Sequence, residues 1–260
     1  MKKILLFFAL FFTVALGIAG CRLSSSSSSK VLQVGMDAAY PPFGFQNLST
    51  KEYEGFDVDI IKAIAKEEGL SVNIRNVNFD GLIPALQSGD LDVAINDITV
   101  TEDRAKSVDF SRTYYFAGLR VVVNASDDSI QKKGDLSGKT IGVTIGSTGE
   151  EAARKIEGAQ VKVYNTLSDA FLDLKQGAVD AVINDIPTNE YYVAKTKDHS
   201  VKTAPIALTK EDLAIAVKKG NHELLSKIND GLAKIKKNGE FSAIYKKWFG
   251  QEPPKNLLEV

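Results

Sequence analysis

The chain has 260 residues, a formal net charge of −1 and a single cysteine. A near-neutral charge gives no electrostatic case for nucleic acid, and one cysteine excludes both an internal disulfide and a cysteine metal cluster. From residue 30 onward no apolar run is long enough to span a membrane, while the chain is long enough for two modest hydrophobic cores.

The first 20 residues have the pattern of an export signal. A basic start leads into an apolar stretch, residues 4–18, which is short for a stable membrane anchor, and the sequence IAGC follows, ending at Cys21. Small residues before the cut are what a signal peptidase needs, and a cysteine directly after them resembles a bacterial lipobox. We therefore expect residues 1–20 to be a lipoprotein signal peptide and Cys21 to carry the lipid. A plain secretory signal with an incidental cysteine is the alternative.

A serine-rich stretch follows the cysteine. Residues 21–30 contain six consecutive serines, which cannot bury apolar surface and are typical of a flexible tether. A tether suits a globular domain that stands off a membrane. We therefore expect a protein held by a lipid on the extracytoplasmic face of the cell membrane.

The next part of the chain predicts alternating strands and helices. Asp57 is a plausible N-cap for the first helix and Asp80 for the second, and glycines end both. Strands that alternate with helices favour a parallel sheet. The expected order is strand, helix, strand, helix, strand, at residues 31–36, 57–69, 71–77, 80–86 and 91–95.

The same order recurs further along the chain. The tetrapeptide INDI closes the series in both halves, at Ile95–Ile98 and at Ile183–Ile186, within longer stretches that align at a constant offset. The sequence therefore predicts two α/β lobes of similar plan. The second series of strands and helices is expected at residues 139–145, 150–157, 161–164, 168–175 and 179–183.

Two apolar, strand-like stretches lie outside the repeats and are well placed to pass between the lobes. They are residues 117–123 and 212–220. Two amphipathic helices follow the second stretch, and the simplest packing returns them to the first lobe. We therefore expect lobe 1 to comprise residues 31–120 and 215–260, lobe 2 to comprise residues 121–214, and a hinge to join them. The two final helices are expected at residues 222–237 and 240–249.

Polar and aromatic residues gather at the ends of the predicted strands. In open parallel sheets, ligands bind beyond the carboxyl ends of the strands. If the lobes face each other, the aspartates of the two INDI copies approach one cleft. The candidate ligand-binding residues are Asp37, Tyr40, Phe79, Asp97, Thr99, Arg104, Ser147, Thr148 and Asp185.

These residue types suit a zwitterion. Arg104 offers a planar fork that matches a carboxylate, and Ser147 opens a helix whose free N–H groups favour an anion. Asp185 is suited to an ammonium group, and Tyr40 and Phe79 are suited to cover the remainder of a ligand. Together they describe a site for an α-amino acid. No residue pattern indicates a metal or a cofactor, and we expect neither.

Six motifs extend this interpretation to a family. They are DAAYPPF, GFDVDI, FDGLIPALQSGDLDVAI, TVTEDRAKSVDFS, GVTIGSTGE and VDAVINDIP. In this order and spacing the chain resembles the polar amino acid-binding proteins of ABC importers, the extracytoplasmic solute-binding family 3 type, from about Lys30 to Gly250. The resemblance implies a two-lobed periplasmic-binding-protein-like (type II) fold, a monomer, and a membrane permease as partner.

The resemblance also implies roles for individual residues. Arg104, with Thr99 beside it, grips the ligand α-carboxylate, and Asp185 holds the α-ammonium. The pair Ser147 and Thr148 helps bind the carboxylate. The aromatic pair, Tyr40 and Phe79, and the acid at the end of the first strand, Asp37, complete the site. Asp97 departs from the pattern, because many relatives carry a small residue there. It either reads the ligand side chain or caps the turn.

The specificity and the class of protein have alternatives. Asp37 and Asp97 near the ligand side chain favour a basic amino acid, arginine and then lysine, over glutamine, and they disfavour an acidic one. A dehydratase of small carboxylic acids, with Asp97 and Asp185 as an acid/base pair, and an amino acid sensor are the competing classes. No histidine, cysteine nucleophile or metal set lies at a strand end, and we therefore expect a binding protein and no enzyme.

Overall fold

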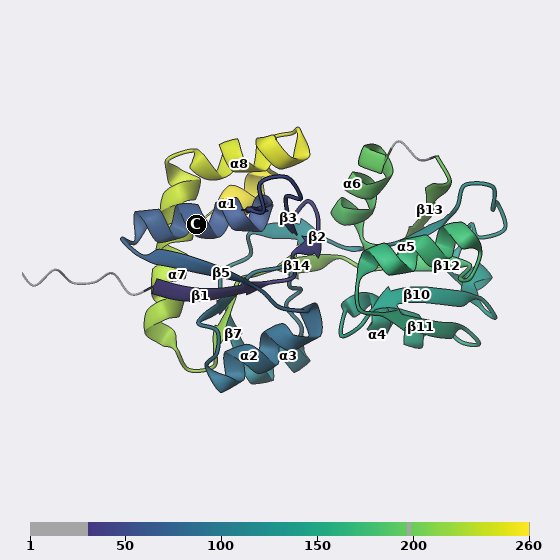
Figure 1. The fold of residues 1–260 in the computed structure, drawn as a ribbon, viewed down its shortest axis with the longest axis horizontal. Coiled ribbons are helices and arrows are strands. Elements are labelled where there is room, and N and C mark those ends of the chain that lie inside the picture. The colour runs from purple at the N-terminus through teal and green to yellow at the C-terminus, as the bar shows by residue number, and fades with distance from the viewer. Residues whose placement is uncertain (1–30, 197–198, 260) are drawn as a thin grey trace, which may run out of the picture.

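The computed structural model describes residues 31–196 and 199–259. The predicted signal peptide, Cys21 and the serine tether lie outside this part of the chain. Within it, no helix combines the length and the apolar character that a membrane crossing requires. Figure 1 shows two α/β lobes side by side with extended segments passing between them, which confirms the predicted two-lobed class.

Lobe 1 is built on a five-stranded sheet in the order β5-β1-β6-β15-β7. The strands β5, β1 and β6 are parallel, and β15 is antiparallel to both of its neighbours. The helices α1, α7 and α8 pack against one another, while α2 packs against β6 and β15. The strands are β1 (Val31–Met36), β5 (Ser71–Asn76), β6 (Val93–Ala94), β7 (Val108–Phe110) and β15 (Ala216–Lys218). The helices are α1 (Phe56–Glu67), α2 (Leu82–Ser88), α3 (Glu102–Ser107), α7 (His222–Lys237), α8 (Glu240–Phe249) and α9 (Lys255–Leu258).

Lobe 2 repeats this plan with the order β11-β10-β12-β9-β13. Again three strands are parallel, and the antiparallel strand beside them, here β9, comes from a segment that crosses between the lobes. The strands are β9 (Leu119–Asn124), β10 (Thr140–Thr144), β11 (Gln160–Tyr164), β12 (Ala181–Asp185) and β13 (Val201–Ala207). The helices are α4 (Thr148–Arg154), α5 (Leu167–Gln176) and α6 (Ile186–Thr196), with a 3₁₀ turn η2 (Lys133–Leu136). The expected lobe boundary at residues 120–121 therefore falls inside β9.

The hinge consists of two short antiparallel strands, β8 (Tyr115–Ala117) and β14 (Glu211–Leu213). Next to it the two crossing segments approach closely, because a Cβ atom on Gly118 would lie 2.4 Å from the carbonyl oxygen of Thr209. Only glycine fits at such a position. The prediction of two crossing segments is confirmed.

The predicted helix boundaries agree with the structure for the helices near the C-terminus of the chain and differ from it for the first two helices. Helices α7 and α8 have the predicted bounds, but neither predicted aspartate cap is correct. Helix α1 begins after Gly55, whose φ of 144° lies outside the range of side-chain-bearing residues. Asp57 lies in the first turn and is fully buried. Asp80 belongs to the 3₁₀ turn η1 (Phe79–Gly81) and makes no cap to α2.

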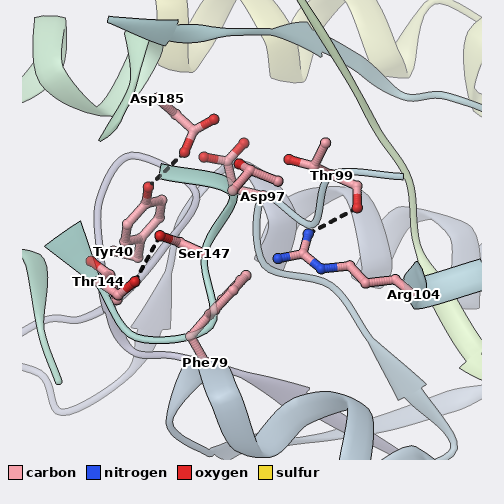
Figure 2. Close-up of a pocket in the computed structure, with 9 residues that line it drawn as sticks. Tyr40, Phe79, Asp97, Thr99, Arg104, Thr144, Ser147 and Asp185 are labelled. Atoms are coloured by element: carbon pink, nitrogen blue, oxygen red, sulfur yellow. Dashed lines mark hydrogen bonds between the residues drawn. The ribbon is translucent and has the colours of Figure 1, made fainter. Parts of the chain in front are cut away.

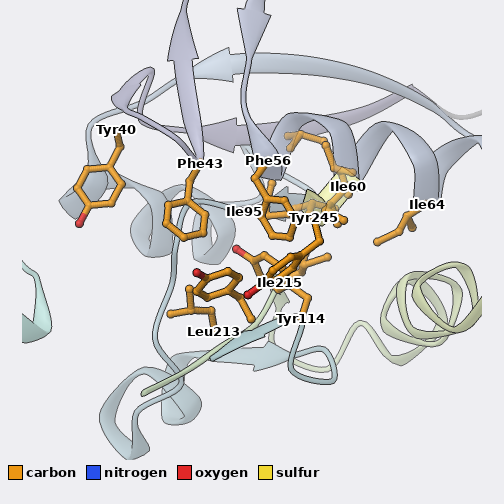
Figure 3. Close-up of a cluster of buried hydrophobic side chains, with 14 of the residues drawn as sticks. Tyr40, Phe43, Phe56, Ile60, Ile64, Ile95, Tyr114, Leu213, Ile215 and Tyr245 are labelled. Atoms are coloured by element: carbon orange, nitrogen blue, oxygen red, sulfur yellow. The ribbon is translucent and has the colours of Figure 1, made fainter. Parts of the chain in front are cut away.

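An aromatic cluster forms the centre of lobe 1 (Figure 3). The ring of Phe56, at the start of α1, lies within about 6 Å of Phe43, Tyr114 and Tyr245. Phe43 lies between the first two strands of the small sheet formed by β2 (Ala39–Tyr40), β3 (Gly44–Gln46) and β4 (Tyr53–Glu54). The cluster therefore fixes the loop after β1 and the start of the hinge against the same helices.

Candidate ligand-binding site

One cavity between the lobes gathers nearly all of the predicted site residues (Figure 2). Strands of both sheets end there, so residues far apart in sequence meet, as parallel topology predicts. Thr144, at the end of β10, joins the predicted residues, whereas Asp37 does not line the cavity. The lining residues are Tyr40, Phe79, Asp97, Thr99, Arg104, Thr144, Ser147, Thr148 and Asp185.

The two lobes contact each other directly across this cavity. Arg104 of lobe 1 donates from Nη2 to the carbonyl oxygen of Gly146 in lobe 2, at 3.0 Å. The Tyr40 hydroxyl lies 2.7 Å from Oδ1 of Asn184 and 3.0 Å from Oδ2 of Asp185. The cavity volume is about 20 Å³, room for one water molecule. A larger ligand must therefore enter as the lobes part and replace some of these direct contacts.

Arg104 is a buried cation whose side-chain hydrogen bonds go to neutral acceptors. Its guanidinium donates to the carbonyl oxygens of Thr99, at 2.9 Å, and Gly146, and it lies over the ring of Phe79 at 5.3 Å from the centroid. Among the described residues, its side-chain hydrogen bonds reach no carboxylate. Burial lowers the pKa of Arg104, and nearby acidic groups oppose this shift only in part. A buried guanidinium of this kind is suited to an anionic group in the cavity.

Asp185 is the last residue of β12, and one of its two carboxylate oxygens accepts a hydrogen bond. Oδ2 accepts the hydrogen bond from Tyr40, while Oδ1 is buried and has no partner within the described part of the chain. Burial, followed by the negative charge of Glu211, raises the pKa of Asp185 to about 7. A cationic group placed against Oδ1 would favour the ionised form.

Asp97 lies in a left-handed backbone conformation, with φ of 53°, which is uncommon for a residue other than glycine. Its N–H group donates to Oδ2 of Asp57 at 2.9 Å, which holds this conformation in place. Both of its carboxylate oxygens are buried and, among the described residues, lack hydrogen-bond partners. Burial, then the charge of Asp185, raises the pKa of Asp97 well above its usual range. The alternative that Asp97 caps a turn has no hydrogen bond to support it.

The remaining acid of the prediction has a different position. Asp37 Oδ1 accepts from the N–H of Ala39 at 3.0 Å, and its own N–H donates to Oδ1 of Asn96 at 2.8 Å. Burial raises the pKa of Asp37. Asp37 thus closes the turn after β1 that carries Tyr40 and lies outside the cavity lining.

The hydroxyl groups of lobe 2 are arranged around the start of α4. Ser147 is the N-cap, because its Oγ accepts from the N–H of Glu150 at 3.1 Å, and it donates to the carbonyl of Thr144 at 2.7 Å. The Thr144 hydroxyl faces the cavity without a partner among the described residues. The Thr148 hydroxyl donates to Oε2 of Glu211 at 3.0 Å. The Ser147 hydroxyl is therefore already engaged by hydrogen bonds to the backbone around the start of α4.

Sequence reasoning missed Thr144 and Glu211. Thr144 is the last residue of β10, so its place at a strand end was a usable signal. Glu211 sits between Lys210 and Asp212 in a charged run, which is typical of a solvated surface. In the folded protein only 8% of the residue is exposed, and its carboxylate contacts Thr99 of lobe 1 and Thr148 of lobe 2.

Two facing α/β lobes, a hinge of paired strands and a polar cavity between them define a class of proteins that close around a small ligand. The sequence places the chain more narrowly. Residues 32–251 match the bacterial extracellular solute-binding proteins, family 3, and the chain belongs to that family.

Individual relatives agree with this assignment. The chain is 36% identical to the arginine-binding extracellular protein ArtP of Bacillus subtilis strain 168, over 97% of this chain and 100% of that protein. It is 34% identical to the L-cystine-binding protein TcyJ of Escherichia coli strain K12, over 86% of this chain and 84% of that protein. Its fold is similar to that of an ancestral arginine-binding protein bound to arginine, with a TM-score of 0.81, 46% identity, and coverage of 85% of this chain and 98% of that one.

Proposed function

We propose that the protein binds a free amino acid between its lobes as the extracytoplasmic binding component of an ABC importer. One observation carries the proposal: the buried guanidinium of Arg104 lines the same small cavity as the carboxylate oxygens of Asp97 and Asp185 that lack partners among the described residues. An α-amino acid brings a carboxylate to the first and an ammonium group to the second. The names of its relatives, which specify arginine and cystine, support this class of ligand.

The charges around the cavity favour a basic amino acid. Asp97 and Asp185 line it, and Glu211 adjoins it through hydrogen bonds to Thr99 and Thr148. Among the described residues that line the cavity, Arg104 is the one cation set against these three acids. Uncompensated carboxylates in a poorly hydrated site are costly, and the raised pKa values of Asp97 and Asp185 express that cost. We therefore propose arginine first, then lysine, then glutamine.

Ligand binding and lobe closure are two parts of one equilibrium in this proposal. Arg104 belongs to lobe 1, and Asp185 and Thr148 belong to lobe 2. A ligand that contacts both sides stabilises the closed arrangement over an open one by these additional contacts. The closed shape is the form that a permease recognises. The bound amino acid passes through this cycle chemically unchanged.

A lipid anchor completes the proposal, although Cys21 lies outside the described residues. The lipobox-like sequence before Cys21 and the serine tether after it support attachment to the outer face of the cell membrane as a monomer. Exchange of Cys21 for serine is expected to move the protein into the aqueous phase of a Triton X-114 partition. Retention of that variant in the detergent phase would contradict the anchor.

The ligand assignment is tested with the twenty amino acids in a thermal-shift panel, followed by calorimetry on those that raise the melting temperature. We expect arginine to give the largest shift, and mass spectrometry to recover it unaltered. A largest shift with glutamate or aspartate would contradict the charge argument. Recovery of a dehydrated or decarboxylated product would favour an enzyme.

A further inference from the structure

Glu211 occupies a position at which three parts of the chain meet. It lies in the hinge strand β14, where it pairs with Ala117 of β8. Its Oε2 accepts the hydroxyl hydrogens of Thr99, at 2.6 Å, and Thr148, at 3.0 Å. Its Oε1 accepts from the hydroxyl of Thr209 at 2.8 Å. Thr99 belongs to lobe 1, Thr148 is the first residue of α4 in lobe 2, and Thr209 lies in a crossing segment.

The direction of these hydrogen bonds constrains the site. A hydroxyl group has one hydrogen to donate, and a carboxylate only accepts. The hydrogens of Thr99 and Thr148 are therefore committed to Glu211, and both hydroxyls offer only lone pairs to anything else. The α-carboxylate of a ligand must then be held by Arg104 and backbone N–H groups, without these two hydroxyls.

Glu211 also separates two spaces. Beyond the ligand cavity lies a more open hollow of about 330 Å³, lined by Glu211 together with Thr99 and Thr148 and edged by Lys133, Lys155 and Lys210. Thr99 and Thr148 line both spaces. The carboxylate, with the hydroxyls of Thr99 and Thr148 bound to it, is thus the partition between the cavity and the outer hollow, and parting of the lobes removes Thr148 from it.

We propose that Glu211 is a positioning residue of the ligand site, which ties lobe 2 to the hinge through Thr148 in the closed form and fixes the hydroxyls of Thr99 and Thr148 as acceptors. This inference rests on the proposed amino acid-binding function. Stability alone does not account for the residue: an acid buried to this degree is costly, and among the described residues its hydrogen-bond donors are threonine hydroxyls with no cation.

The test compares Glu211→Gln with Asp212→Asn in the full-length protein. Both exchanges convert an acid to its amide in the same strand, but the Asp212 side chain is exposed, so it is a matched control for charge. We expect Glu211→Gln to weaken arginine binding about tenfold by calorimetry, because the tie loses charge-assisted hydrogen bonds. Asp212→Asn is expected to stay within about twofold of the wild type. Equal affinities for wild type and Glu211→Gln would overturn the proposal.

A double-mutant comparison identifies the tie itself. Thr148→Val removes the hydroxyl donor while keeping the shape of the side chain. If Glu211 acts through Thr148, the double variant Glu211→Gln/Thr148→Val weakens binding no more than the stronger of the two single variants. If the loss of affinity in the double variant equals the product of the two single losses, the two residues act separately. Thr148→Ser keeps the hydroxyl donor, and it is therefore expected to bind arginine with wild-type affinity.

A readout without ligand separates this inference from the proposed function. Trp248 is the only tryptophan of the chain and lines a groove between the lobes, together with Tyr115 of the hinge and Tyr191 of lobe 2. Loss of the tie lets the lobes part more often, so the Trp248 emission of ligand-free Glu211→Gln is expected to shift to the red, and that of Asp212→Asn to stay unchanged. An unshifted spectrum would contradict the tie. Failure of every amino acid to bind the wild type, with the shift present, would reject only the proposed function.

Discussion

Exchange of Asp185 for asparagine is expected to stabilise the protein while impairing its binding function. Asparagine keeps the shape of the side chain and still accepts the hydrogen bond from Tyr40, but it carries no charge. Burial raises the pKa of Asp185 from its ordinary value of 3.8 to about 7 in the folded protein. A difference of about three units corresponds to about 4 kcal/mol, which is an upper estimate for the cost of ionising this group.

The sign of the pH dependence follows from the direction of that shift. Between pH 4 and pH 7 the folded protein holds the proton on Asp185, whereas the unfolded chain has released it. The free energy of unfolding therefore falls as the pH rises through this window. The asparagine variant lacks this contribution, so its advantage over the wild type is close to zero at pH 4 and reaches up to about 4 kcal/mol at pH 8.

Urea unfolding of both proteins, followed by circular dichroism at one-unit steps from pH 4 to pH 8, measures this difference. Calorimetry at pH 7 is expected to show that the variant has lost affinity for all amino acids alike, because the ammonium group that it no longer holds is common to them. A stability difference that does not change with pH would refute the reasoning. So would a variant that is less stable than the wild type at pH 8.

Three further exchanges test other contacts of the cavity. Arg104→Lys keeps the charge but loses the planar fork, and we expect affinity to fall at least tenfold by calorimetry, whereas a loss below threefold would contradict the clamp. Tyr40→Phe removes the hydroxyl bonded to both Asn184 and Asp185, and a loss of about 1 kcal/mol in urea unfolding is expected, against no change if these bonds contribute nothing. Asp97→Asn suits the left-handed backbone and removes an ionisable carboxylate. By calorimetry, the variant is expected to favour glutamine over arginine relative to the wild type. An unchanged ratio of the two affinities would show that Asp97 does not read the ligand side chain.

The general plan of the molecule could be predicted from the sequence because local patterns determine it. The periodicity of α7 and α8 gave their bounds, and the two INDI stretches identified equivalent strands of the two sheets. Parallel strands bring their carboxyl ends to one edge, and a cavity formed by residues at those ends was therefore foreseeable. The predicted ligand-binding residues that line it follow from this rule, with Asp37 as the departure.

What could not be predicted depends on contacts between distant segments. Asp57 resembles a helix cap in the sequence, yet its carboxylate holds the backbone of Asp97, 40 residues away. Glu211 resembles a surface acid, yet its partner Thr99 is 112 residues away. Neither role leaves a periodic pattern, because each depends on how the hinge and the first turn of α1 pack. The place of Asp37 outside the cavity lining has the same origin, since its N–H pairs with Asn96 of a neighbouring strand end.

The order of strands in lobe 1 has a consequence for how the chain is made. Strand β15 lies between β6 and β7, although it follows β7 by about a hundred residues of sequence. During synthesis from the N-terminus, the strands of lobe 1 therefore cannot all pair until β15, near the end of the chain, has been made. Lobe 2, whose strands run without interruption from β9 to β13, has all of its partners earlier. The part of the protein that is made first is thus the last to gain all of its strands.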